Sequence, residues 1–375
     1  MSFNPDAESP LKYTQRGALC YVLTTGMCNL KCDYCGGSFP NHLVPPSIKY
    51  TIRDLQDFLS GVEGLVIAFY GGEPLLNHSW VMKVMERIDA EHFVIQTNGT
   101  LIDRLPRDYW LQMDAILLSV DGVEEVTDRH RGRGVYKKVV ESARKLREMG
   151  YEGDLIARMT LTESSDVYRD AIHLLSLNLF DHVHWQLNAV WNPDMEGFKF
   201  WLLNEYVPKL ERLVDLWVSN LLRGKILGIA PFKALSYAIA RNLSLGAPPC
   251  GAGWNALAIN TSGDVLSCPI AVDVSWARLG NVKRSTFVDL LGRVGIGDPC
   301  TSCDYGALCG GRCLYAYHER LWGDEGFEVL CRATRALIDQ LFSSKSEIEE
   351  AIKEGSVKID ALNYPPFPNT IEIIP

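Results

Sequence analysis

The sequence predicts an α/β fold in which a partial, TIM-like (βα)6 barrel is followed by a small cysteine-rich domain. Six short apolar runs alternate with helical patterns between Leu19 and Asn188, as expected for parallel βα units. Seven of the eleven cysteines then follow, between Cys250 and Cys331. A chain of 375 residues is long enough for one large barrel and a smaller domain.

The six predicted strands are short apolar segments, and most are followed by an amphipathic helix. The strands span residues 19–24, 64–70, 92–96, 115–120, 155–161 and 182–188, and the helices 52–59, 80–88, 136–149 and 167–175. After the sixth strand, residues 198–222 predict a long helix that is kinked or split at Pro208. Residues 232–243 predict one more helix.

We predict four parts in the chain. The Gly-Ala-Pro-Pro stretch that begins at Gly246 marks the main boundary, and prolines interrupt the C-terminal end. The parts are an N-terminal extension (1–18), the barrel (19–245), an iron–sulfur domain (246–341), and a C-terminal helix with an extended tail (342–375).

Composition excludes several classes of protein. The chain is 47% hydrophobic and 22% charged, which is typical of a globular protein. Its net charge of -9 argues against a nucleic-acid or acidic-membrane binder, although residues 129–133 form a local basic run. We find no signal peptide and no membrane span, so we expect a cytoplasmic protein. In a reducing compartment eleven cysteines indicate metal ligands rather than disulfides.

Cys28, Cys32 and Cys35 form a C-x3-C-x2-C motif, with Tyr34 directly before the last cysteine. Three thiolates can hold three irons of a [4Fe–4S] cube, whereas ordinary electron-transfer clusters use four cysteines. The spacing therefore predicts a cluster with one iron open to a small molecule. The alternative is a zinc knuckle, which would need nearby partners, and no cysteine follows until Cys250.

Glycines and polar residues stand at or near the ends of the predicted strands. In α/β barrels the ligand-binding face is built from these strand ends. The alternative is that they form turns or, for an arginine, lie on the surface. The candidates are Gly71, Gly72 and Glu73 after the second strand, Asn98 after the third, Ser119 in the fourth and Arg158 in the fifth.

The sixth predicted strand alternates between polar and apolar residues. Val183, Trp185 and Leu187 share one face, and the polar residues from His182 to Asn188 share the other. A polar face directed into the barrel suggests a substrate cavity, although hydrogen-bonded core residues are the alternative. The predicted substrate contacts are His184, Gln186 and Asn188.

These motifs resemble the radical SAM superfamily. The resemblance implies that S-adenosylmethionine chelates the open iron and that an electron from the cluster cleaves it to a 5′-deoxyadenosyl radical. It also implies that Gly-Gly-Glu contacts the methionine amino group and that the other strand ends contact the rest of the molecule. The S-adenosylmethionine contacts expected on this basis are Tyr34, Gly71, Gly72, Glu73, Asn98, Ser119 and Arg158.

The C-terminal cysteines have the order C-x12-G-x4-C, C-x2-C-x5-C-x3-C, then C, which resembles the SPASM domain. The resemblance implies two auxiliary [4Fe–4S] clusters beside the S-adenosylmethionine-binding one. Residues 242–249 lack a cysteine, so the inner cluster has an open iron or another ligand. A zinc ribbon is the alternative. The expected ligands are Cys250, Cys268 and Cys313 for the inner cluster, and Cys300, Cys303, Cys309 and Cys331 for the outer one.

SPASM-type radical SAM enzymes mostly modify peptides or protein side chains. We therefore expect hydrogen abstraction from a peptide or protein substrate, giving an oxidative crosslink or another post-translational modification. An external low-potential donor of the flavodoxin or ferredoxin type would supply electrons. Because only 27 residues precede Cys28, we expect that a leader peptide, if there is one, needs a separate leader-peptide-binding protein or another surface.

The chain departs from the sulfatase maturases, which it otherwise resembles. They place an aspartate base directly after the second SPASM cysteine, whereas Cys268 is followed by Pro269, and the next aspartate is Asp273. Formylglycine formation is therefore disfavoured, and no general base is identified. The alternatives are a maturase of a tetrapyrrole or quinone precursor and a non-catalytic iron–sulfur carrier. Cys20, which belongs to neither cysteine set, is expected in the core.

Overall fold

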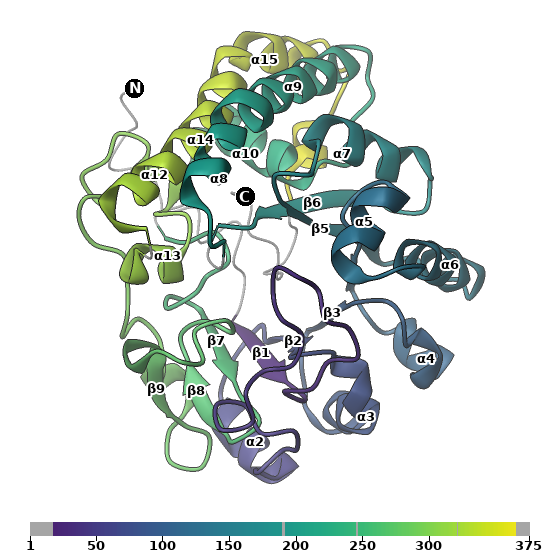
Figure 1. The fold of residues 1–375 in the computed structure, drawn as a ribbon, viewed down its shortest axis with the longest axis vertical. Helices are drawn as coiled ribbons and strands as arrows, with labels where there is room; N and C mark the ends of the chain where they lie inside the picture. Colours follow the sequence, from purple (N-terminus) through teal and green to yellow (C-terminus); the bar gives the residue numbers. More distant parts are fainter. Residues whose placement is uncertain (1–17, 190–191, 245–246, 321, 365–375) are drawn as a thin grey trace.

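Parallel strands form most of a single sheet in the computed structural model, which describes residues 18–189, 192–244, 247–320 and 322–364. The strand order is β6-β5-β4-β3-β2-β1-β7-β8-β9. The described part confirms the predicted α/β fold, with a barrel that is not closed (Figure 1). The first six strands are β1 (Leu19–Leu23), β2 (Val66–Tyr70), β3 (His92–Thr97), β4 (Ala115–Ser119), β5 (Asp154–Leu161) and β6 (His182–Leu187).

Helices follow the strands and cover the outside of the sheet (Figure 1). Side-chain caps stabilise the N-termini of two of them: Thr51 and Asp54 form a capping box at α2, and Asp166 caps α7. The helices up to the end of the barrel are α2 (Ile52–Leu59), α3 (His78–Arg87), α4 (Arg107–Trp110), α5 (Glu124–Arg131), α6 (Val135–Glu148), α7 (Val167–Ser176), α8 (Met195–Trp201), α9 (Val207–Leu222) and α10 (Ala230–Arg241).

The sheet separates two apolar cores. The larger core lies between the outer face and the helices, and it includes Phe58, Trp110 and Trp185. The smaller core lies on the inner face, where small residues such as Ala68 and Ala115 stand beside larger ones. Small inner side chains leave room inside an open barrel, as a ligand-binding barrel requires. Cys20 is fully buried in the larger core, as predicted.

The cysteine-rich region continues the barrel sheet. Strand β7 (Ala256–Ile259) pairs in parallel with β1, and β8 (Asp264–Leu266) and β9 (Arg278–Asn281) extend the sheet in antiparallel pairs. The predicted boundary between 245 and 246 lies outside the described residues. The remaining helices are α11 (Phe287–Leu290), α12 (Gly306–Cys309), α13 (Leu314–Glu319), α14 (Gly323–Ser343) and α15 (Lys345–Lys353).

The C-terminal helices pack back on the barrel. Helices α14 and α15 both contact α9 (Figure 1). The predicted division after residue 341 falls inside α14. Residues 1–17 and 365–375, most of the predicted N-terminal extension and extended tail, lie outside the described residues. In the described part, no helix combines the length and apolar character needed to cross a membrane.

Two helical segments differ from the sequence-based expectation. The helix expected over 198–222 begins at Met195, and a π-helical turn at Leu202–Tyr206 joins α8 to α9 just before Pro208. Proline has no N–H to donate to the preceding turn, which favours such an irregularity. Helix α5 was not predicted, because it is short and mostly charged.

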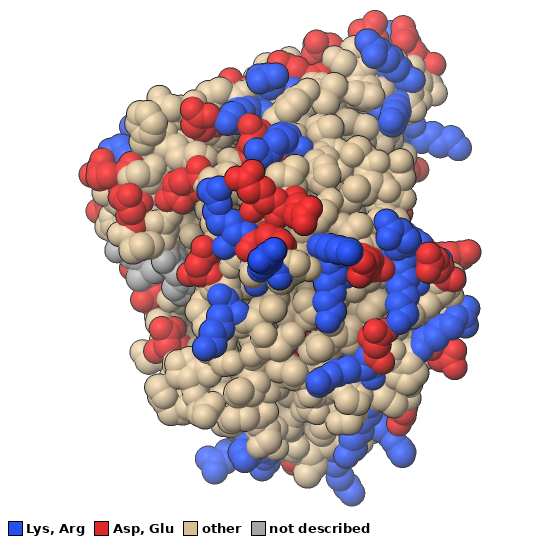
Figure 2. Space-filling view, turned by 45° about the vertical axis from the view of Figure 1, so that its right-hand side comes forward, with Lys and Arg blue, Asp and Glu red and all other residues tan. Residues whose placement is uncertain are grey.

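The basic run at 129–133 is therefore not a surface patch. His130 and Arg131 end α5 and are buried, whereas Arg129 is exposed. On the face drawn in Figure 2, basic and acidic side chains are interspersed.

Candidate active site

Cys28, Cys32 and Cys35 lie on a loop that follows β1 at the carboxyl end of the barrel strands. The backbone N–H groups of Cys35 and Gly36 donate to the Cys32 carbonyl at 3.2 and 2.9 Å, which makes a tight turn between two of the thiols. Cys32 is buried, Cys28 is half-buried and Cys35 is exposed. The loop thus presents its thiols near the surface of the barrel mouth.

The thiols of this loop influence one another. The Cys32 thiol donates a hydrogen bond to the Cys35 sulfur, which lowers the pKa of Cys35 to about 6. The same bond, together with burial, raises the pKa of Cys32. Burial raises the pKa of Cys28, whose thiol also lies within the electrostatic influence of Cys35. A thiolate is the form that binds metal, so the loop favours at least one ligand in its binding state.

The donor set fits an iron–sulfur cluster. Among the described residues, no group of three or more histidine, cysteine or acidic side chains converges on the position of one metal ion. A single ion draws its ligands to about 2.0–2.3 Å, whereas a cube binds each thiolate to a different iron. Three thiols on one loop can each bind a different iron, which fits the second arrangement.

The Gly-Gly-Glu segment packs against this loop. A Cβ on Gly71 would lie 2.5 Å from the Thr25 carbonyl oxygen, and one on Gly72 would lie 2.3 Å from that of Met27. The backbone N–H groups of Gly72 and Glu73 donate to these same two oxygens at 3.0 and 2.8 Å. The glycines therefore allow two backbone segments to approach closely.

The Glu73 carboxylate connects the ends of β2 and β3. It is fully buried and accepts from the Thr97 hydroxyl at 2.7 Å and from the backbone N–H groups of Asn98 and Leu75 at 2.8 and 3.1 Å. Burial raises its pKa to about 7, against the opposing effect of these donors. These hydrogen bonds tie the carboxylate to the ends of both strands, beside the two glycines.

Strand register places three of the predicted contacts in one row. Ser119 pairs with Arg158, and Arg158 pairs with His184, so their side chains share the inner face of β4, β5 and β6. The next row pairs Thr160 with Gln186. These positions lie at the carboxyl half of the strands, on the same side as the cysteine loop.

Two polar nitrogens on this inner face are buried without a hydrogen-bond partner in the described structure: Arg158 Nε and Gln186 Nε2. Arg158 makes one hydrogen bond through Nη1, to the Met159 carbonyl at 3.0 Å. Buried donors normally find partners, so these nitrogens mark places where a ligand would supply acceptors. His184 is fully buried, and Gln186 and Asn188 are half-buried.

Asn98 links the end of β3 to the cysteine loop. Its amide nitrogen donates to Asn29 at 2.8 Å and reaches the Cys28 sulfur at 4.0 Å. Its side-chain oxygen accepts from the Thr100 hydroxyl at 2.6 Å. Asn98 therefore supports the loop, while Ser119, although largely buried, lies in the inner-face row.

Sequence reasoning missed a charged network behind the site. Asp121, fully buried after β4, accepts two hydrogen bonds from Arg131 at 2.7 and 2.8 Å, one from the Tyr34 hydroxyl at 3.0 Å and one from the Thr160 backbone at 2.8 Å. Burial alone would lower the pKa of Arg131, but the Asp121 carboxylate outweighs this effect and raises it. The signal was the spacing of α5, where Thr127 and Arg131 share one buried stripe.

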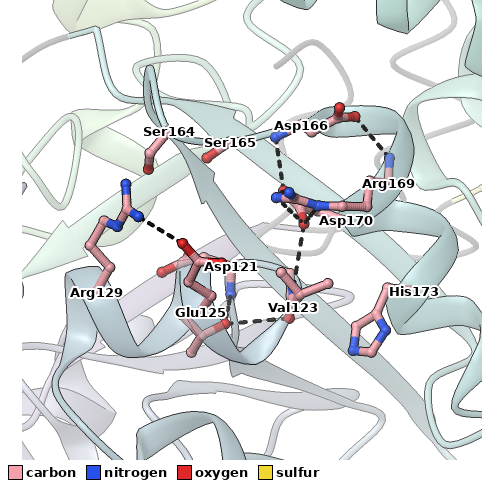
Figure 3. Close-up of polar contacts among 12 residues, drawn as sticks. Asp121, Val123, Glu125, Arg129, Ser164, Ser165, Asp166, Arg169, Asp170 and His173 are labelled. Atoms are coloured by element: carbon pink, nitrogen blue, oxygen red, sulfur yellow. Dashed lines mark hydrogen bonds and ion pairs between the residues drawn. The ribbon is translucent and has the colours of Figure 1, made fainter.

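Asp170 holds the turn that follows Asp121 at the end of β4 (Figure 3). This buried carboxylate accepts from the backbone N–H groups of Val123 and Asp166 at 3.4 and 2.9 Å, and from the Arg169 guanidinium. A Cβ on Gly122 would lie 2.4 Å from the Asp170 carboxyl carbon, and Gly122 has φ +132, so this position requires glycine. The turn after β4 is thus fixed from two sides.

The structure brings the four outer cysteines together. They line a cavity of about 510 Å³, measured with its open mouth, between α12 and α14. Burial raises the pKa of Cys309 to about 12 and that of Cys331 to about 11, and each thiol also lies within the influence of other cysteines of the group. Four thiols around one cavity fit the donor set of a fully ligated cluster. With one inner cysteine, the cysteines that line it are Cys300, Cys303, Cys309, Cys313 and Cys331.

The three inner cysteines lie in a separate apolar cluster with Ala271 and Tyr315. Tyr315 is within electrostatic reach of two of these thiols and of Asp273; burial, and to a lesser extent these groups, raise its pKa to about 12. Asp273 itself is exposed. The three thiols of this cluster are Cys250, Cys268 and Cys313, the last of which also lines the outer cavity.

Comparisons with known proteins agree with this geometry. Residues 22–171 match the Radical SAM superfamily. A cysteine-type anaerobic sulfatase-maturating enzyme of Clostridium perfringens is 22% identical over 370 residues, covering 87% of this chain and 96% of the relative.

Two solved structures share the fold. The histidine-tagged anSMEcpe structure with bound AdoMet aligns with a TM-score of 0.67 at 19% identity, covering 92% of this chain and 98% of that one. Streptococcus suis SuiB bound to precursor peptide SuiA aligns at 0.53 and 18% identity, covering 82% of this chain and 74% of SuiB. Residues 22–171 thus carry a radical SAM domain, and the chain is homologous to anaerobic sulfatase-maturating enzymes and shares its fold with anSMEcpe and SuiB.

Proposed function

We propose that this radical SAM enzyme removes hydrogen from a carbon of a peptide or protein substrate, giving an oxidative crosslink or another post-translational modification. The observation that carries the proposal is the position of the three-cysteine loop. It lies at the carboxyl end of the strands, where the inner face carries the unpartnered nitrogens of Arg158 and Gln186. Three thiols, too few for a cluster ligated by four cysteines, thus lie at the same strand ends as these buried nitrogens, which supports a ligand site there.

Each group of cysteines would hold one [4Fe–4S] cluster. Cys28, Cys32 and Cys35 would hold the cluster that binds S-adenosylmethionine, and the seven C-terminal cysteines would hold two auxiliary clusters in the groups described above. When bound, the first cluster and S-adenosylmethionine supply one-electron cleavage of the sulfonium and, from it, a hydrogen-abstracting agent. The electron would come from a flavodoxin- or ferredoxin-type donor.

The residues of the chain would bind and orient S-adenosylmethionine and the substrate. The backbone at Gly71 and Gly72 would receive the methionine amino group, held in place by the buried Glu73. The Arg158 guanidinium would bind the methionine carboxylate, with Ser119 beside it in the same row. Tyr34 would support the adenosyl part from the cysteine loop. Gln186, with His184 and Asn188 on the same strand face, would contact the substrate.

A peptide substrate is supported by the relatives. SuiB was solved with its precursor peptide, and the C. perfringens relative is a sulfatase-maturating enzyme. The present chain lacks an aspartate directly after Cys268, and the nearest one downstream, Asp273, is exposed, so we do not assign it formylglycine formation. A separate leader-peptide-binding protein, or another surface of this chain, would bind a leader peptide.

The test is anaerobic turnover of the reconstituted, reduced protein with S-adenosylmethionine and peptides encoded by short reading frames beside its gene. We expect 5′-deoxyadenosine and a peptide that has lost two hydrogens, or an epimer of unchanged mass. No cleavage in any condition would indicate a non-catalytic carrier. Cleavage with modification of a tetrapyrrole or quinone precursor, and of no peptide, would support the small-molecule alternative.

A further inference from the structure

Both residues that separate Cys32 from Cys35 are held by the last turn of α5. The Asp33 carboxylate lies 2.8 Å from His130 Nδ1, and the Asp33 backbone N–H donates to the His130 carbonyl at 3.2 Å. Tyr34 donates its hydroxyl to Asp121 at 3.0 Å, and Asp121 is bound by the adjacent Arg131. The Asp33-Tyr34 segment between two predicted metal ligands is thus held by contacts with one helix, which we call the α5 grip.

The Arg131 side of this grip is buried and rigid. The Arg131 and Asp121 side chains are 7% and 0% exposed, and their two parallel hydrogen bonds fix the guanidinium plane. The Arg131 guanidinium carbon also lies 5.5 Å from the centre of the Tyr34 ring. Breaking this pair would leave a buried charge, so the pair holds one geometry.

The His130 side extends to the strand that carries Arg158. His130 Nε2 lies 2.6 Å from the Ser164 hydroxyl and 3.0 Å from the Thr162 hydroxyl, both directly after β5. Asp33, His130 and Ser164 have the order of a hydrolytic triad. However, the Asp33 side chain is 58% exposed, and two hydroxyl groups share His130 Nε2. We therefore assign this series of hydrogen bonds a structural role.

We propose that His130 and Arg131 are positioning residues that fix the spacing of Cys32 and Cys35 before metal enters and align the cysteine loop with β5. The inference deepens the proposed function and rests on it for the identity of the metal group. The grip itself involves only residues of this chain. These contacts would hold the cysteine thiols in place before the metal group binds, which lowers the entropy cost of binding it.

The first test needs no metal. Backbone hydrogen exchange of the cluster-free chain would be compared for His130→Ala, His130→Asn, Arg131→Lys and wild type. We expect exchange in the peptide that contains the three cysteines to rise about tenfold in His130→Ala and Arg131→Lys, because a charge-assisted contact is lost. His130→Asn should recover part of the protection, since its amide can donate from the Nδ1 position.

Arg129→Gln is the matched control. Arg129 lies in the same helical turn, but it is exposed, and among the described residues its guanidinium forms an ion pair with Glu125, 2.9 Å away; Figure 3 draws this pair. Its substitution should leave exchange of the cysteine loop unchanged. Equal exchange of this loop in wild type and in both His130→Ala and Arg131→Lys, with the rest of the chain folded, would overturn the proposal.

The second test uses the reconstituted protein under a chelator. The EPR signal that responds to S-adenosylmethionine reports only the cluster of the three-cysteine loop. We expect it to disappear several-fold faster in His130→Ala than in wild type, while auxiliary signals decay at the same rate. Uniform decay of all signals would contradict a local role. If the wild-type protein shows no EPR signal that responds to S-adenosylmethionine, the proposed function is refuted. The hydrogen-exchange result would still test whether His130 and Arg131 hold the cysteine loop.

Discussion

The two cysteine regions are stabilised in opposite ways. The three-cysteine loop is surrounded by charged and polar groups that reach it from β3, β4 and α5, among them Asn98, Asp121 and Arg131. The C-terminal cysteines lie in an apolar cluster and in a cavity between α12 and α14. We infer that the two regions have different roles, because polar surroundings suit a site that exchanges ligands and apolar ones limit the access of water to the auxiliary clusters.

The largest effects should separate these two regions by function. Cys32→Ala should reduce 5′-deoxyadenosine formation at least about a hundredfold, more than ~2.7 kcal/mol in activation free energy. Cys331→Ala should leave S-adenosylmethionine cleavage detectable but abolish modified peptide, because the outer cluster would lose a ligand. Mass spectrometry of nucleoside and peptide checks both. Equal loss of cleavage in the two variants would remove the functional distinction.

Arg158 should matter for binding more than for folding. Its Nε has no partner in the described structure, so Arg158→Ala removes little from the free protein. We expect the Kd for S-adenosylmethionine to rise about tenfold, or ~1.4 kcal/mol, in calorimetric titration of the reconstituted protein. Arg53→Ala, which removes a side chain that is 87% exposed on α2, is the control. Unchanged affinity in Arg158→Ala would move the methionine carboxylate elsewhere.

Glu73 should make the stability of the barrel mouth depend on pH. Its folded-state pKa of about 7 lies above the ordinary value of 4.5, so the folded state retains the proton. Its contribution is therefore complete below pH 4.5 and is lost as the pH rises to about 7, by on the order of 3 kcal/mol.

The Glu73→Gln variant isolates this contribution. The glutamine side chain cannot ionise, so the difference in unfolding free energy between wild type and variant should change by a similar amount between about pH 5 and pH 8. Urea unfolding of the cluster-free chain measures both. A difference that stays constant with pH would show that the carboxylate is ionised throughout this range.

The smallest effect concerns the cysteine outside both regions. Cys20→Ala should lower the unfolding free energy by about 1 kcal/mol, because a small buried group is removed from the core. Iron and sulfide content should remain those of wild type, as metal analysis would show. Loss of iron in this variant would mean that the cysteine groups have been divided wrongly.

Sequence reasoning succeeded where the signal is local. Each of the six apolar strands lies within a short stretch of sequence, and the structure gathers the four cysteines predicted for the outer cluster around one cavity. The pairing of β1 with β7 could not be predicted, because it joins residues more than two hundred positions apart. The burial of Arg131 was missed because an arginine-rich run normally indicates a solvated surface.

The inner face was predicted in part. The alternation of the sixth strand identified the face that carries His184 and Gln186. For Glu73 the residue type predicted a ligand contact, which stays a prediction, but the hydrogen bonds of its carboxylate with Thr97 and Asn98 could not be predicted. Side-chain direction at a strand end depends on its neighbours in space, which a single sequence does not contain.

The most direct test of the account is an EPR titration of the anaerobically reconstituted, reduced protein with S-adenosylmethionine. The account predicts roughly twelve irons per chain, a signal from one cluster that changes on titration, and 5′-deoxyadenosine as product. Bound zinc in place of iron, or three clusters of which none responds to S-adenosylmethionine, would contradict it.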